Sequence, residues 1–238
     1  MQNQSIDKTV PPIVPLYDTW GGKKSAGRWC IVPPFDFTNL STQFVNAWYI
    51  NSTIGTIDAF DELARVWKVF FSPSSESDIK GVVLEWQPGS SYEEYIEHLL
   101  KAIREYPAAI EELAMQVELL VFVRTEESPH QPIRAWVRFL GELLICGGLE
   151  YGEPDFCFSV HHTLFYPFSY HNSADNSELY SLNQPLLENA LRRWEERFGS
   201  ISEVEGLKGI YEYGFKPKEE WAAKSTNSYF DSNDCSLL

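Results

Sequence analysis

Apolar residues repeat three and four positions apart in several segments of the chain, which is the spacing of a core-facing helix stripe. This spacing predicts a first helix from about Ile57 to Phe71. A second helix is predicted to begin at Ser91, because Ser91 and Glu94 have the spacing of a capping box. Pro107 should end it before a further short helix.

A longer helix is predicted near the end of the chain, running to Phe198. Asn183 or Gln184 would cap it, Pro185 would occupy the first turn and Gly199 would stop it. Runs of β-branched and aromatic residues predict strands between the helices. These strands are expected at 29–32, 44–50, 81–86, 118–124, 133–140, 142–147, 156–166 and 209–215, with 133–147 forming a hairpin bent at Gly141.

The helices are unevenly spaced and some strands follow one another directly, so strict alternation of strand and helix fails. The pattern therefore predicts a single α+β domain with a mixed or mainly antiparallel sheet and about four helices packed on it. Residues 28–221 would form this domain, between an irregular N-terminal arm (1–27) and a flexible C-terminal tail (222–238).

Composition adds a strong charge bias to this picture. The 238 residues include 34 acidic and 19 basic side chains, for a formal net charge of −15, and eight are tryptophan. Negative charge on this scale repels phosphate backbones, so nucleic-acid binding is not expected. No run of about 18 apolar residues predicts a membrane span, and the first residues lack the layout of a signal peptide. We expect a cytoplasmic protein.

The four cysteines, Cys30, Cys146, Cys157 and Cys235, form no close pair of the kind found in zinc ribbons or redox motifs. Motifs for a serine nucleophile, a phosphate loop and a metalloprotease helix are also missing from the sequence. We therefore predict no cofactor and no catalytic residue.

Three of the five histidines lie in the segment Phe158–His171. If 156–166 is a regular strand, His161 and His162 point to opposite faces and cannot share one metal. Cys157 and His161 share a face but would lie about 13 Å apart, too far for a zinc ion to bridge. His161 remains a candidate for a small-ligand or hydrolase pocket on the polar face of this strand. The candidate pocket residues are Ser159, His161, Thr163, Glu153 and Asp155.

A second candidate site lies on the preceding strand, where alternation puts Arg134, Trp136 and Arg138 on one face. Two guanidinium groups beside an indole suit an anionic or aromatic ligand. The alternative is that the arginines pair with an acid on a neighbouring strand, such as Glu118, and in an acidic chain we favour this second interpretation.

These observations favour a non-catalytic protein-interaction protein with an acidic surface. A negative surface speeds association with a basic protein, and the composition is typical of immunity proteins and antitoxins that bind basic toxins. Two alternatives stay open. One is the small-ligand-binding or hydrolase pocket on the 156–166 strand, and the other is metal binding by His161 or His162 together with His171.

Overall fold

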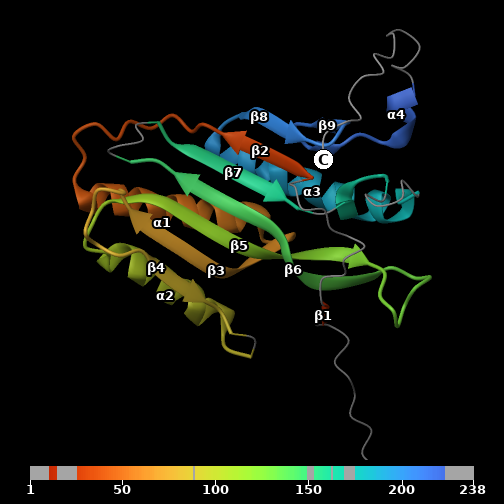
Figure 1. Cartoon of the computed structure of the whole chain (residues 1–238), viewed down its shortest axis with the longest axis horizontal. Helices are drawn as coiled ribbons and strands as arrows, with labels where there is room; N and C mark the ends of the chain where they lie inside the picture. The colour runs from red at the N-terminus through yellow and green to blue at the C-terminus, as the bar shows by residue number, and fades with distance from the viewer. Residues whose placement is uncertain are drawn as a thin grey trace, which may run out of the picture.

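A computed structural model describes residues 11–14, 26–87, 89–148, 153–161, 163–168 and 175–222. Its central feature is an eight-stranded sheet in the order β4-β3-β5-β6-β7-β2-β8, with β1 beside β6 (Figure 1). Only β1 and β6 pair in parallel within this sheet; every other pairing is antiparallel. The strands are β1 (Ile13–Val14), β2 (Gly27–Ile31), β3 (Ala64–Pro73), β4 (Val82–Glu85), β5 (Ile110–Val123), β6 (Ile133–Cys146), β7 (Asp155–Val160) and β8 (Ile201–Gly206).

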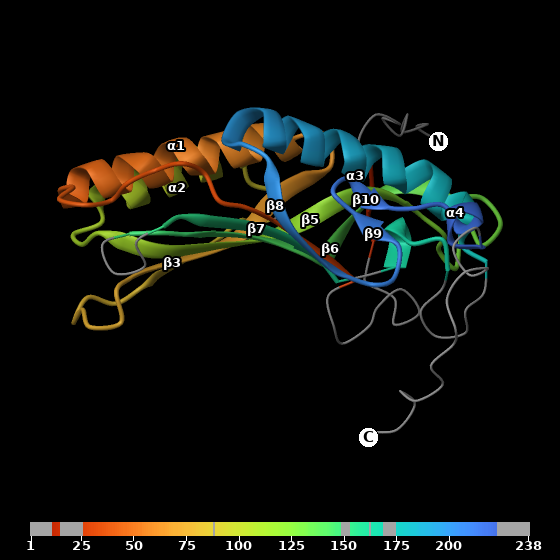
Figure 2. The same cartoon turned by 90° about the horizontal axis from the view of Figure 1, so that it is seen from above.

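Three long helices lie on one face of the sheet (Figure 2). They are α1 (Thr42–Phe60), α2 (Tyr92–Glu105) and α3 (Ser177–Phe198), and α1 contacts both of the others. Aromatic rings fill the space between the two layers: Phe158 lies 4.6 Å from Phe60 between ring centroids, and Phe156 lies 4.9 Å from Phe198. The predicted α+β architecture is confirmed. A small hairpin of β9 (Ile210–Tyr211) and β10 (Gly214–Phe215) precedes the short α4 (Lys218–Ala222).

The first predicted helix, 57–71, and the predicted strand, 44–50, are both wrong. Helix α1 covers 42–60 and strand β3 covers 64–73. The buried side of α1 carries polar residues, including Asn46, Thr53 and Thr56, so the sequence has no clear apolar stripe there. The Asn46 amide donates hydrogen bonds to the carbonyls of Tyr106 and Ala108 and accepts one from the amide of Ile110.

The prediction for α2 is confirmed, and the Ser91 hydroxyl accepts a hydrogen bond from the Glu94 amide as expected. The short helix expected after Pro107 is instead the first half of β5. Helix α3 begins at Ser177, earlier than predicted, which leaves Pro185 inside the helix. It ends at Gly199, whose φ of 107° suits glycine.

Asn183, predicted to cap this helix, lies inside it and bonds to other segments. Its side chain is fully buried, accepts a hydrogen bond from the Phe122 amide and donates to the carbonyls of Phe122 and Leu164. The side chain thereby attaches α3 to strand β5.

Three strand predictions also need correction. The expected strand 209–215 is the β9–β10 hairpin, with a turn at 212–213. The expected hairpin over 133–147 is one continuous strand, β6, with a bulge between Val137 and Gly141. The expected strand 156–166 is too long, because β7 ends at Val160 and Thr163–Phe165 forms a 3-10 turn. Leu164 and Phe165 are buried in that turn. His162, His171 and Cys235 lie outside the described residues.

Candidate functional site

The face of the sheet opposite the three long helices, here called the open face, carries a row of apolar side chains. Directly paired residues on antiparallel strands project to the same side of a sheet, so the register defines this row. The apolar row consists of Val83, Phe70, Ala114, Leu144, Cys157 and Cys30, one residue from each of six neighbouring strands. Val83 is 55% exposed and Phe70 is 38% exposed, so at least this end of the row meets solvent.

Polar rows lie on both sides of the apolar row. The first contains Glu85, Lys68, Gln116, Glu142, Ser159, Arg28 and Glu205. The second contains Ser72, Glu112, Cys146 and Asp155, while Glu203 continues the apolar row at its end on β8. Carboxylates therefore outnumber cations on this part of the open face. Glu85, Glu203 and Glu205 are exposed.

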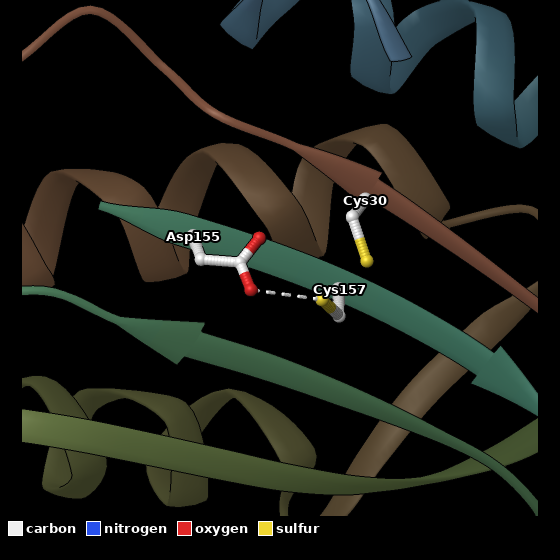
Figure 3. A group of neighbouring side chains, drawn as sticks. All are labelled: Cys30, Asp155 and Cys157. Atoms are coloured by element: carbon white, nitrogen blue, oxygen red, sulfur yellow. Dashed lines mark hydrogen bonds between the residues drawn. The ribbon is translucent and has the colours of Figure 1, made fainter. Parts of the chain in front are cut away.

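The two cysteines in the apolar row lie beside Asp155, at the end nearer β8 (Figure 3). The side-chain ligand atoms of Cys30, Asp155 and Cys157 all lie within 4.8 Å of one another. The Cys157 thiol donates to Asp155 Oδ2 at 3.3 Å, and the Arg28 guanidinium donates to Cys157 Sγ at 2.9 Å. Arg28 also forms ion pairs with Asp155 at 3.9 Å and with Glu205 at 3.4 Å.

The chemistry of these thiols follows from their surroundings. A hydrogen bond with Cys30, burial and the charge of Asp155 raise the pKa of Cys157 above its usual range. Burial and the charge of Glu112 raise the pKa of Cys146, which stands opposite Asp155 in the sheet, to about 12. Both thiols are therefore protonated at neutral pH and are poor nucleophiles.

A buried carboxylate, Glu118, lies on the open face farther along β5. Its side chain has no exposed area, and it accepts hydrogen bonds from Nε of Arg65 at 2.6 Å and from Nε of Arg138. Tryptophan rings pack against both guanidinium groups. Arg65 lies 4.1 Å from the ring centroid of Trp136 and 4.6 Å from that of Trp86, and Arg138 lies 4.8 Å from that of Trp67.

The Arg134, Trp136 and Arg138 candidate site is therefore occupied by the protein's own groups. Arg138 pairs with Glu118, which is the interpretation favoured from the sequence. The ring of Trp136 packs against Arg65, and Arg134 donates to the backbone carbonyl of Glu62 at 3.2 Å. Trp136 and Arg138 are half-buried, whereas Arg134 remains exposed.

The candidate pocket residues do not come together in one hollow. His161 is half-buried and lines a hollow of about 120 Å³ with Gln116, Gly141 and Glu142. Glu153 lines a different hollow of about 490 Å³, between Phe35–Asn39 and Gly148. Strand β7 separates the two, and its six residues span about 20 Å.

The remaining pocket residues divide in the same way. Ser159 projects from the open face in the row of Glu142 and Arg28, whereas Asp155 belongs with the cysteines. Thr163 begins the 3-10 turn after β7.

Sequence reasoning missed the proximity of Cys30 and Cys157. No spacing rule connects residues so far apart in the chain, and only the strand order makes β2 and β7 neighbours.

Comparison with protein-family models, with curated proteins and with solved structures finds no match to this chain. In the described part of the chain, no helix is both long enough and apolar enough to cross a membrane.

Proposed function

We propose that this chain is a non-catalytic interaction protein that binds a basic protein partner through the open face of its sheet. The observation that carries the proposal is the apolar row with carboxylates on both sides of it. Protein interfaces combine a desolvated apolar centre with a polar rim, and this arrangement has the same form.

The size of the surface supports the same proposal. Cys30 and Cys157 are each 2% exposed, so the accessible part of the apolar row comes from the four strands β4, β3, β5 and β6. At about 4.8 Å per strand this part is about 14 Å long. A standard interface buries about 800 Å² on each partner, so the polar rows on both sides of the apolar row would supply the rest of the contact area.

Charge supports a basic partner over a neutral one. The formal net charge is −15, and exposed Glu85, Glu203 and Glu205 lie at the two edges of the open face. Carboxylates placed around an apolar centre accelerate encounter with a positively charged protein and disfavour acidic competitors. Immunity proteins and antitoxins that neutralise basic toxins are the class of binder we propose. A cytoplasmic setting is part of the proposal, supported by the scattered cysteines of the sequence.

The test compares variants on opposite sides of the molecule. The full chain serves as bait in lysate of the native organism at low and at high salt, with captured proteins cross-linked and identified by mass spectrometry. Phe70→Ser combined with Val83→Ser removes the exposed end of the apolar row. Phe44→Ser is the matched control, because Phe44 is 68% exposed but lies on α1, in the helical layer. Circular dichroism checks that each variant is folded.

We expect wild-type protein and Phe44→Ser to capture the same basic protein at low salt and to lose it at high salt. The open-face double variant should fail to capture it, and cross-links should involve residues of β3–β6. Capture that survives the double variant would place the interface elsewhere and overturn the proposal. The absence of any partner at both salt concentrations would also overturn it.

A further inference from the structure

We propose that Cys30, Cys157 and Asp155 form a binding site for a zinc ion on the open face. The site includes Cys30 and Cys157, which also belong to the apolar row, but zinc binding does not require the proposed basic partner. The sequence did not predict this site. Three side chains with metal-ligating atoms, two sulfurs and a carboxylate oxygen, converge to within 4.8 Å of one another (Figure 3). Thiolate and carboxylate together are ligands that zinc accepts.

The backbone explains why the three ligands converge. Cys30 on β2 and Cys157 on β7 are direct partners in the antiparallel register, so their side chains leave the sheet on the same side. Asp155 precedes Cys157 by two residues on β7 and shares that face. Two rigid neighbouring strands thus hold all three side chains, which is a favourable foundation for a metal site.

The distances suit zinc without movement of the strands. Zinc bonds to sulfur at about 2.3 Å and to carboxylate oxygen at about 2.0–2.2 Å, so a tetrahedral ion places sulfur and oxygen about 3.5 Å apart. Cys157 Sγ and Asp155 Oδ2 are separated by 3.3 Å. The other separations among the three ligand atoms are at most 4.8 Å, compared with about 3.8 Å between two sulfurs bound to a tetrahedral zinc ion.

The charges balance once Arg28 is included. Binding forms two zinc–sulfur bonds and breaks two S–H bonds, whose protons pass to solvent, so the ligands contribute two thiolates and one carboxylate. Their three negative charges are matched by Zn²⁺ and by the Arg28 guanidinium. Arg28 donates to Cys157 Sγ at 2.9 Å and forms an ion pair with Glu205 at 3.4 Å. It acts as a positioning residue that stabilises the bound thiolate.

The structure also provides a way in for the ion. The side chain of Asp155 is 43% exposed, whereas Cys30 and Cys157 are each 2% exposed. Zinc would enter past Asp155 and reach the sulfurs behind it. Three protein ligands leave a fourth position for water, as in zinc sites that keep one position open.

The experiment uses the full chain without a histidine tag, reduced and freed of metal by a chelator. Titration with Zn²⁺ in a calorimeter measures affinity and stoichiometry, and Cd²⁺ reports thiolate ligation by its ultraviolet charge-transfer band. We expect one equivalent of zinc per chain. Cys30→Ser and Cys157→Ser should each weaken binding by at least about a hundredfold, and Asp155→Asn by about tenfold. Cys146→Ser and Cys235→Ser are the matched thiol controls and should bind as wild type does.

A second measurement protects the test against misfolding of a variant. Zinc should raise the melting temperature of the wild-type protein and of Cys146→Ser, because a ligand that binds only the folded state stabilises it. It should leave Cys157→Ser unchanged while circular dichroism shows that this variant is folded. The absence of zinc binding to reduced wild-type protein would overturn the proposal. Undiminished zinc binding to Cys30→Ser would also overturn it. A mass of the wild-type protein lower by two hydrogens would overturn it as well, if it showed that Cys30 and Cys157 form a disulfide that excludes metal.

Discussion

The buried carboxylate of Glu118 should be among the most sensitive positions of the fold. Glu118→Gln keeps the size of the side chain but removes the negative charge between Arg65 and Arg138. Because Glu118 has no exposed area and the two arginine side chains are only 19% and 25% exposed, water cannot replace the lost charge. Both guanidinium groups would remain among tryptophan rings without their counter-charge.

The size of the effect follows from the burial of this group. Removal of one partner from a buried ion pair costs about 3–5 kcal/mol, whereas an exposed pair contributes about 0–1 kcal/mol. The arginines retain some solvent contact, and a glutamine oxygen can still accept one hydrogen bond. We therefore expect a loss of about 3 kcal/mol in the free energy of unfolding. For a protein of 238 residues this corresponds to a fall of about 10 °C in melting temperature.

Urea denaturation followed by tryptophan fluorescence measures the loss. The matched control is Glu178→Gln, because Glu178 pairs with Arg124 on the surface, where the two side chains are 52% and 40% exposed. That variant should lose less than about 1 kcal/mol. Arg138→Met, alone and with Glu118→Gln, completes a double-mutant cycle that isolates the pair. A loss below about 1 kcal/mol for Glu118→Gln would refute the argument that burial controls the strength of this cluster.

Three further predictions concern other parts of the fold. Asn183→Leu should lower the free energy of unfolding by about 2 kcal/mol, because it leaves the half-buried Phe122 amide without its acceptor and the Leu164 carbonyl without its buried donor. Ser91→Ala should cost about 1 kcal/mol, because the Glu94 amide at the start of α2 loses its cap. Burial raises the pKa of Cys146 to about 12, so the folded state holds this proton more tightly than the unfolded chain does. Stability should therefore be constant below about pH 8.5 and fall as the pH rises from there towards 12.

Urea titrations check all three predictions, the last of them repeated between pH 8 and pH 10.5. Asn189→Leu is the control for Asn183, because Asn189 lies on the exposed side of the same helix. Cys146→Ser should reduce the alkaline loss relative to wild type. A wild-type stability that does not change up to pH 10.5 would contradict the argument from burial, and so would equal losses for the two asparagine variants.

The sequence predicted elements whose signals are local. The capping residue and apolar stripe of α2 lie within one segment, and Gly199 ends α3 where its conformation requires glycine. Prediction failed where tertiary contacts override local preference. Helix α1 buries Asn46, whose side chain accepts a hydrogen bond from the backbone amide of Ile110. Because polar residues lie on its buried side, the sequence shows no apolar stripe for this helix. In β3 the bulge at Trp67 breaks the alternation and leaves apolar residues at helix-like spacing.

The candidate site shows the same division. The pairing of Arg138 with Glu118 was accessible from charge and alternation within two neighbouring strands. The apolar row and the Cys30–Cys157 pair depend on the order of six strands, which no local pattern encodes. The candidate pocket was assembled from neighbours in sequence, whereas His161 and Glu153, just beyond the two ends of β7, line different hollows.

The position of β2 has a consequence for biosynthesis. This early strand lies between β7 and β8, and its contact from Arg28 to Cys157 joins residues 129 positions apart. At a translation rate of about 5–20 residues per second, β7, the first strand that can pair with β2, is synthesised on the order of ten seconds after β2. Strands β3 to β6 follow one another closely and can assemble earlier. The late return of β2 to β7 would then bring the two cysteines together, and β8, which is made after β7 and pairs with β2, would complete the sheet at its edge.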